Sequence, residues 1–384
     1  MTKTSAARTA QVAGVRSAIE AALILAAGMG FGRFAFTAIY PHMVDDGVLS
    51  LREGSLVASA NYAGYLLGAI LAARARAHNA HRLCLLSVTG TAIFLAVLAL
   101  PLSAWAIMAV RGLAGVFSAL SMVAASLWLL EQRGHFQGAP VLYAGVGIGI
   151  ALSSEMLVLG AHAGLHSAGM WLMLGAVTLV IGLVAAPGLV ASGSKTPHTL
   201  ARSAPLTLAP VAVWPLVVVY GLSGLGYIVT ATYLPLLVKI ALPDLDSAHV
   251  WAVFGLGAAP SCFLWHRIHE RLGTRHALPL NLLIQALGVA LPTFTQIATG
   301  YLLSAMLVGG TFMGTVTIAL PAAQRAARKE GASLLATMTL VYGIGQVIGP
   351  VFADGLYAHS HTFSSSLLVA AAALVVAAVV SLRL

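Results

Sequence analysis

Long apolar stretches separated by short polar segments dominate the pattern of this chain. Each is about as long as the ~20 residues that a helix needs to cross a bilayer. The twelve stretches lie at 16–41, 52–75, 82–102, 104–131, 137–161, 168–187, 210–240, 249–267, 277–296, 298–322, 332–357 and 364–382. Several gaps are so short that neighbouring helices must run antiparallel. The pattern predicts an all-α membrane protein with twelve transmembrane helices.

Composition and charge support this class. Hydrophobic residues make up 59% of the chain and charged residues 8%, whereas soluble domains average about 25% charged residues. The net charge of +9 does not indicate nucleic-acid binding: with the N-terminus in the cytoplasm, 16 of the 20 Lys and Arg residues fall on the inner side. Such an excess marks cytoplasmic loops. We therefore expect both termini in the cytoplasm and no nucleic-acid partner.

Two segments repeat each other at a fixed offset. Residues 32–41 and 226–235 both end an apolar stretch with a proline, 194 positions apart, and the same offset superimposes the basic turn at 74–82 on a second basic turn. Residues 188–209, rich in Ser, Thr, Pro and Gly, have the composition of a linker. We expect an N-terminal bundle of six helices at 1–187, a cytoplasmic linker at 188–209 and a C-terminal bundle of six helices at 210–384.

Several motifs resemble those of the major facilitator superfamily of secondary transporters. The loop with Glu270, Arg271, Gly273 and Arg275 is similar to the family's Asp/Glu-Arg-x-Gly-x-Arg-Arg/Lys loop, although His266 replaces the usual leading glycine. The matching loop of the first half lacks the acid and the glycine. Further resemblances are Arg111 to Gly115, which is similar to an Arg-x-x-x-Gly element, and the glycine-rich stretches around 145–149 and 343–350. The segments 30–34 and 58–65 resemble the poorly characterised bacterial YbfB/YjiJ group.

The resemblance implies two pseudo-symmetric bundles that work by alternating access in the bacterial inner membrane. It implies a monomer without a cofactor, in which the first and fourth helices of each half line a central cavity. Residues expected to take part in gating or in helix sliding between the halves are Glu270, Arg271, Gly273, Arg275, Gly145, Gly149, Gly345, Gly349 and Pro350. Pro350 is also expected to bend its helix, because it lacks an N–H.

Two arginines lie at membrane depth, Arg33 in the first stretch and Arg111 in the fourth. A cation there costs about 2.5–3.5 kcal/mol on insertion scales, so it usually faces a cavity, a partner or a substrate. Asn61 and Tyr62 reach a similar depth, and we expect water and solute to reach both guanidinium groups. The alternatives are that Arg33 snorkels to the interface or that the arginines form structural ion pairs.

Glu155 is the carboxylate that lies well inside the first half. At the depth of Arg111 it can act as the proton-coupling acid with Arg111 as its partner, or form a static ion pair with it. In the second half, hydroxyl groups able to bind a substrate without fixing a charge belong to Tyr227, Thr230, Tyr233, Thr311 and Thr315. Packing of the helix core explains these residues equally well.

These features favour a proton-coupled symporter of a small organic anion, because two arginines and one carboxylate leave a positive site. The alternatives are efflux of amphipathic drug-like compounds and transport of a neutral, sugar-like solute. Enzyme activity is not expected: Gly221-Leu-Ser223-Gly224 resembles a rhomboid-type motif, but a histidine at membrane depth is missing. The histidines are scattered over several loops, so no metal site is expected.

Overall fold

The computed structural model describes residues 2–190, 213–330 and 333–384. Most of the predicted linker at 188–209 therefore lies outside the described residues. Every regular element of the described residues is a helix. This confirms the predicted class of an all-α membrane protein. The elements are α1 (Thr2–Leu25), η1 (Ala26–Phe34), α2 (Ala35–Asp45), α3 (Leu51–Ala72), η2 (Ala77–Asn79), α4 (Ala80–Val97), α5 (Ala104–Ser126), η3 (Leu127–Gln132), η4 (Phe136–Gly138), α6 (Ala139–His162), α7 (Ser167–Val190), α8 (Val213–Ala241), α9 (Ser247–Phe294), α10 (Ala298–Glu330), α11 (Ser333–Ser360) and α12 (Ser364–Ser381).

Eleven helical segments of the described chain are long and apolar enough to cross a membrane. The difference from the predicted twelve comes from α9, which covers the stretches predicted at 249–267 and 277–296. A straight helix of its 48 residues would measure about 72 Å, but Gly273 breaks it with a φ of 69° and a ψ of 173°. Trp265 and Asn281 both donate to carbonyls of α10, at Gly310 and Thr311, so the two parts of α9 run back alongside each other.

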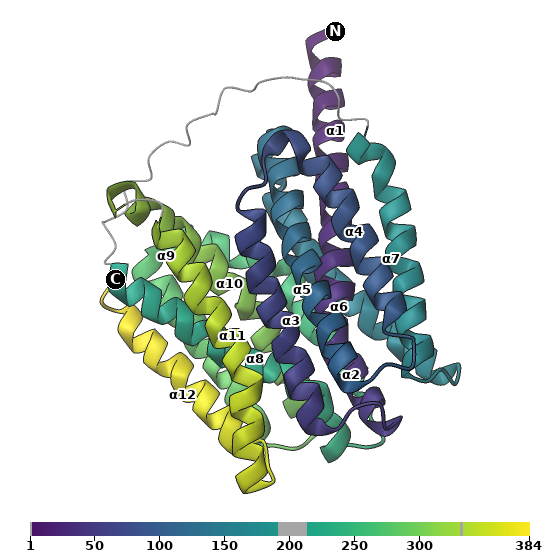
Figure 1. Ribbon diagram of the computed structural model, residues 1–384. Helices are drawn as coiled ribbons and strands as arrows, with labels where there is room; N and C mark the ends of the chain where they lie inside the picture. The colour runs from purple at the N-terminus through teal and green to yellow at the C-terminus, as the bar shows by residue number, and fades with distance from the viewer. Residues whose placement is uncertain (1, 191–212, 331–332) are drawn as a thin grey trace.

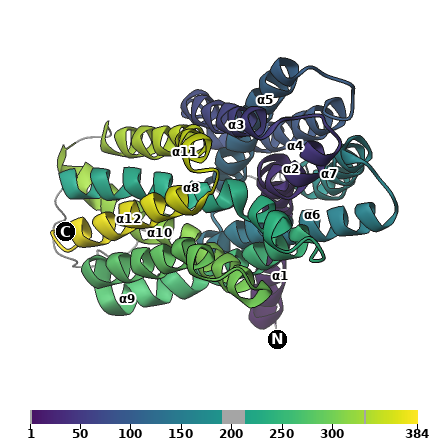
Figure 2. The ribbon, with the colours of Figure 1, turned by 90° about the horizontal axis from the view of Figure 1, so that it is seen from below.

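The helices before residue 190 and those from residue 213 onward form two groups (Figures 1 and 2). The groups meet where α6 packs against α9 and where α3 packs against α11. They lean away from each other toward the end that carries the N-terminus. We call the opposite end, with the loops at 46–50, 163–166 and 242–246, the distal end.

Hydrogen bonds and ion pairs between the groups gather in the distal half of the membrane segments. Among the described residues, these contacts are Arg33–Gln346, Phe34–Trp251, Thr37–Ala231, Asp45–Lys239, Ser55–Tyr233, Tyr62–Thr232 and Glu155–His249. The structure thus holds a conformation in which the two groups are joined at the distal end.

The sequence repeat has a direct structural counterpart. Thr37 Oγ1 donates to the carbonyl of Ala231 at 2.6 Å, and the two residues are 194 positions apart. That separation equals the offset between the repeated segments, so Thr37 contacts its own equivalent in the other half. Two equivalent positions can only touch near the axis that relates them. This axis therefore passes through the contact between α2 and α8.

We predicted that the paired glycines lie between the two halves and let them slide. In this structure their contacts are within one half, so the prediction is wrong for this conformation. A Cβ on Gly145 or Gly149 would meet the backbone of Ala22 or Ala26 in the same half. On Gly345 or Gly349 it would meet α8, also within one half. Instead Gly147 faces the backbone of Gly255 and Ala259, and Gly343 faces the side chain of Leu66. Gly147 and Gly343 each stand two residues from a predicted glycine and lie at the seam, because residues two apart point to opposite sides of a helix.

Candidate functional site

The first membrane helix changes its winding at the level of the predicted site. Its middle segment, η1, is a π-helix with the sequence AAGMGFGRF, and such segments occur frequently at functional sites. Its glycines allow close neighbours: a Cβ on Gly28 would meet Ser121, and one on Gly30 would meet the backbone of Gly149. The segment is consequently packed between α5 and α6, and all nine of its residues are buried.

Side chains of other helices donate to the carbonyls of η1. Arg111 Nη1 bonds the carbonyl of Gly32 at 2.7 Å, and its Nη2 bonds that of Arg33 at 3.0 Å. Ser118 Oγ donates to the carbonyl of Gly28 at 2.6 Å. From the other half, Trp251 Nε1 donates to Phe34 at 3.0 Å. Arg111 therefore fixes the main chain that carries Arg33, which is a structural task.

Arg33 contacts the second half directly. Its Nη2 donates to Gln346 Oε1 at 2.9 Å, and Gln346 Nε2 donates to Tyr227 Oη at 2.6 Å. Tyr227 is the repeat equivalent of Arg33, because the two are 194 positions apart. One buried amide of α11 thus links equivalent positions of the two halves, which places Arg33 at the centre of the seam.

Aromatic rings surround the guanidinium group of Arg33. Its central carbon lies 4.1 Å from the ring centre of Tyr65, 5.0 Å from that of Tyr62 and 5.2 Å from that of Phe34. Rings at this distance attract a cation through their negative faces, by about 2 kcal/mol when the pair is desolvated. The rings stabilise the charge without neutralising it.

The charge of the site has no acidic partner. Neither Arg33 nor Arg111 forms an ion pair with a carboxylate of the described residues. Both Nε atoms are buried without a hydrogen-bond partner in the described chain. Among the described residues the buried carboxylate is Glu20. It lies away from this site, toward the N-terminal end, and pairs with Arg16. Two cations without a carboxylate partner among the described residues therefore lie in the membrane interior, and the side chain of one bonds the main chain of the other.

The expectation that water reaches both guanidinium groups is wrong for this conformation. Arg33 is 3% exposed and Arg111 is 1% exposed. Arg111 is covered because it lies within one half, between η1 and the rings of Phe36 and Trp171. Arg33 is covered by the rings of Phe34, Tyr62 and Tyr65 of its own half and by Gln346 of the other half. Separation of the halves would therefore take Gln346 away from Arg33 and leave Arg111 in place.

The predicted pairing of Glu155 with Arg111 is also wrong. Glu155 Oε1 lies 2.9 Å from His249 Nδ1, and both side chains are about half exposed. Glu155 has the predicted depth but lies on another side of its helix, turned toward α9 instead of α5. It belongs to the contacts that join the two halves at the distal end, and we do not assign it a proton-coupling role.

Other predicted site residues are occupied by packing between helices. Asn61 Nδ2 donates to the carbonyl of Arg111 at 2.8 Å and thereby ties α3 to α5. Thr311 Oγ1 donates to its own helix at Leu307, and Thr315 Oγ1 donates to Asn281 Oδ1 at 2.7 Å. The polar groups of these three residues bond other helices or their own helix, as the packing alternative predicted. These contacts do not support the prediction that the residues bind substrate.

Three further predicted residues lie at or near the seam. Tyr62 Oη is 3.0 Å from Thr232 Oγ1 of the other half. Tyr233 Oη lies 2.7 Å from Ser55 Oγ and 2.9 Å from the carbonyl of Pro350. Thr230 is fully buried, and its hydroxyl has no hydrogen-bond partner in the described part of the chain. Tyr62 and Tyr233 join the halves, so Tyr62 would lose Thr232 and Tyr233 would lose Ser55 when the halves separate, whereas the contact of Tyr233 with Pro350 lies within one half.

The predicted gating loop forms the reversal within α9. Gly273 supplies the positive φ, which glycine adopts without the steric penalty of a Cβ. Glu270 Oε1 lies 3.3 Å from His266 Nε2, the residue that replaces the usual glycine. Arg271 and Arg275 are exposed. The loop thus holds the turn, and its role in gating remains a prediction.

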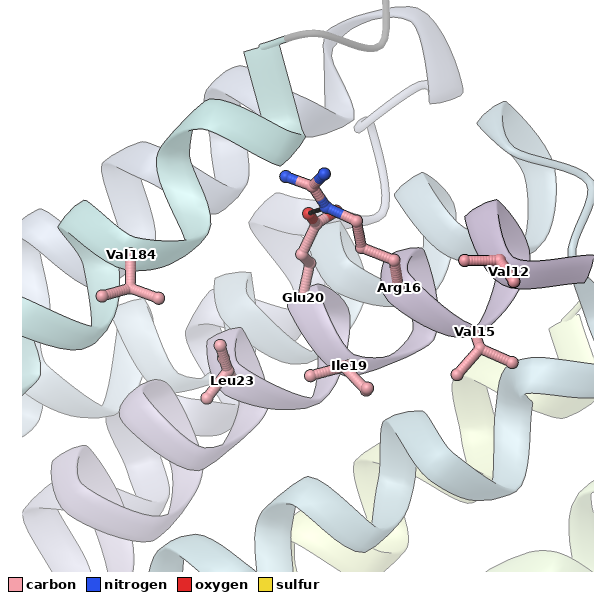
Figure 3. A pocket seen from close by; sticks show the side chains of 7 residues that line it. All are labelled: Val12, Val15, Arg16, Ile19, Glu20, Leu23 and Val184. Atoms are coloured by element: carbon pink, nitrogen blue, oxygen red, sulfur yellow. Dashed lines mark hydrogen bonds and ion pairs between the residues drawn. The ribbon is translucent and has the colours of Figure 1, made fainter. Parts of the chain in front are cut away.

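A groove of about 650 Å³ lies elsewhere, between α1 and α7 near the N-terminal end (Figure 3). Its walls are mostly aliphatic, and its two charged residues, Arg16 and Glu20, bond each other at 2.9 Å. An aliphatic groove on the outer side of a membrane helix suits acyl chains better than a polar solute. We therefore place the functional site at Arg33 instead.

Sequence reasoning missed Gln346, Tyr65 and Tyr342 as site residues. Gln346 is 2% exposed, and its signal in the sequence was an uncharged amide within an otherwise apolar stretch. Tyr65 and Tyr342 gave no distinct signal, because aromatic residues are ordinary in membrane helices. Only the packing of the two halves shows that Gln346 and Tyr65 contact Arg33 and that Tyr342 stacks on Tyr227, the hydrogen-bond partner of Gln346.

Comparison with known proteins gives a family and a fold. A family model described as "Uncharacterised MFS-type transporter YbfB" matches residues 25–382. No match was found among curated protein sequences. A crystal structure of the nucleoside transporter NupG, carrying the D323A substitution, matches with a TM-score of 0.70 and 14% identity, over 96% of this chain and 98% of that one. At that identity the likeness shows the fold alone.

Proposed function

Since the chain belongs to the major facilitator superfamily, in the family of the MFS-type transporter YbfB, we propose that this transporter carries a small organic anion that Arg33 binds between its two halves. The chain is a multi-pass membrane transporter, and the proposal concerns its substrate. Arg33 takes over the role that the sequence assigned jointly to Arg33 and Arg111.

The uncompensated charge of Arg33 is the observation that supports an anion. A buried guanidinium group usually has a carboxylate or phosphate partner, because burial of an unpaired charge is costly. Arg33 has one neutral side-chain acceptor, Gln346, and three rings. A carboxylate of the substrate would complete this set, and arginine can bind it through two parallel hydrogen bonds.

The place of Arg33 at the seam suits alternating access. In the observed conformation residues of both halves enclose it at the distal end, which the distribution of Lys and Arg assigns to the outside of the cell. When the halves separate there, the bond to Gln346 breaks and Arg33 becomes reachable from that side. We propose that the α9 turn at Glu270–Arg275 supports the corresponding motion at the opposite end.

A nucleoside is the second candidate, because a protein of the same fold is a nucleoside transporter. Its amide-like groups could bond Gln346, and its base could contact the rings around Arg33. An uncharged nucleoside would leave the guanidinium group without a counter-charge, so we favour the anion. A neutral sugar-like solute has the same shortcoming and lacks a flat ring.

Uptake into proteoliposomes tests the proposal. Labelled mono- and dicarboxylates are compared with uridine, for the wild type, Arg33→Gln and Arg52→Gln; Arg52 is an exposed arginine at the distal end of α3. We expect uptake of at least one carboxylate, its loss in Arg33→Gln and its retention in Arg52→Gln. Uptake of uridine alone, or carboxylate uptake that persists in Arg33→Gln, would contradict the anion proposal. Parallel runs with and without a pH gradient measure proton coupling.

A further inference from the structure

A row of tyrosine rings leads away from Arg33 along the seam. Tyr227 and Tyr342 lie with ring centres 6.1 Å apart and planes 20° apart, and Tyr342 and Tyr220 lie 4.6 Å and 29° apart. Tyr227 also stacks on Phe312 at 5.6 Å. Tyr220 precedes Tyr227 by seven residues on α8, which is about 10 Å along a helix. The row therefore runs from the Gln346 amide toward the N-terminal end.

Two rings of this region keep part of their surface free. Tyr65 of α3 and Tyr342 of α11 are half-buried, whereas Tyr220 and Tyr227 are buried. Tyr65 is also the ring closest to the guanidinium carbon of Arg33, at 4.1 Å. The two partly exposed rings come from opposite halves, because Tyr65 lies on α3 and Tyr342 on α11. These two helices pack against each other across the seam.

We propose that the anion is an aromatic carboxylate, whose acid group binds Arg33 and whose ring stacks against Tyr65 and Tyr342. This inference rests on the proposed function and narrows its substrate class. Aromatic rings prefer offset stacked or edge-to-face contacts, and these add attraction beyond the burial of apolar area. A saturated ring of equal size buries similar area but lacks that attraction.

A pair of matched probes measures the difference. Benzoate and cyclohexanecarboxylate carry the same charge on rings of the same atom count, and their dissociation constants from the purified full-length protein are measured by calorimetry. Variants are Tyr342→Leu, Tyr342→Phe, and Trp105→Leu as a control for loss of an aromatic ring, because Trp105 is 77% exposed. Thermal unfolding midpoints show which variants fold.

We expect the wild type to bind benzoate about twofold to tenfold more tightly than cyclohexanecarboxylate. The preference should persist in Tyr342→Phe and Trp105→Leu and decrease in Tyr342→Leu, where Tyr65 is the ring that remains. Equal binding of both probes by the wild type would overturn the aromatic assignment and leave the anion proposal intact, and this comparison needs no variant. Binding of neither probe would also overturn the aromatic assignment, and the uptake of the carboxylate panel then decides the anion proposal separately.

Discussion

The substitution Gln346→Glu places a carboxylate at the position where the substrate anion is proposed to bind. Glutamate has the same shape, so one oxygen can keep the 2.9 Å contact with Arg33. The other can accept a hydrogen bond from Tyr227 Oη, which now accepts one from the amide at 2.6 Å. The site would then carry its own counter-charge.

The magnitude follows from Coulomb's law. At 2.9 Å and an effective dielectric constant of about 20, the new pair attracts with roughly 6 kcal/mol before the desolvation of the carboxylate is subtracted. A second anion at about 4 Å from Glu would be repelled by roughly 4 kcal/mol. That repulsion alone corresponds to almost a thousandfold weaker binding. We therefore expect anion affinity to fall by at least about a hundredfold.

The assay is a calorimetric titration of the wild type, Gln346→Glu and Gln346→Met with benzoate. The methionine variant removes the amide without adding charge, and we expect it to weaken binding only a few-fold. Thermal unfolding of each protein shows that the fold is intact. If the glutamate variant folds and binds benzoate within threefold of the wild type, the anion does not bind beside Arg33.

Three further substitutions separate structural from functional residues. Arg111→Met should lower the free energy of unfolding by about 2–4 kcal/mol, because the η1 carbonyls of Gly32 and Arg33 lose their donors. The benzoate affinity of its folded fraction, measured by titration, should stay within threefold of the wild type. Glu155→Gln should leave carboxylate uptake within twofold of the wild type, because Glu155 contacts His249 away from the arginines; a complete loss would restore its coupling role. In the distal loop, burial raises the pKa of Asp46, but hydrogen bonds from Ser167 and His166 outweigh this and keep the pKa below its usual value. The ionised Asp46 therefore stabilises the fold above its unfolded pKa of about 4, and this effect is lost as the pH falls through its folded pKa. We expect the thermal unfolding midpoint of Asp46→Asn, measured between pH 7 and pH 3, to fall less steeply toward acid than that of the wild type.

The membrane helices could be predicted from the sequence because burial in lipid requires long apolar stretches, whatever the partners of each helix. The offset of 194 between the repeated segments also reappears, as the contact between Thr37 and Ala231. The sequence predicted the two parts of α9 as separate apolar stretches, 249–267 and 277–296, on either side of a charged loop. Gly273 of that loop makes the reversal.

The site was only partly predictable because depth along a helix does not fix the direction of a side chain. Arg33, Arg111 and Glu155 were placed in one layer, yet Glu155 turns to His249. The two arginines have different tasks: Arg111 bonds carbonyls of η1, which has π-helical winding, whereas Arg33 bonds Gln346 of the other half. Hydropathy carries no signal for that winding, and none for the partnership of Gln346 with Arg33.

The most direct test of the central claim is the dissociation constant of benzoate for the wild type and for Arg33→Gln, measured by calorimetry on protein of equal thermal stability. Loss of hydrogen bonds to a charged group is worth about 1.5–3 kcal/mol, so the variant should bind at least about tenfold more weakly. Equal dissociation constants for the two proteins would show that the buried cation at the seam does not hold the anion.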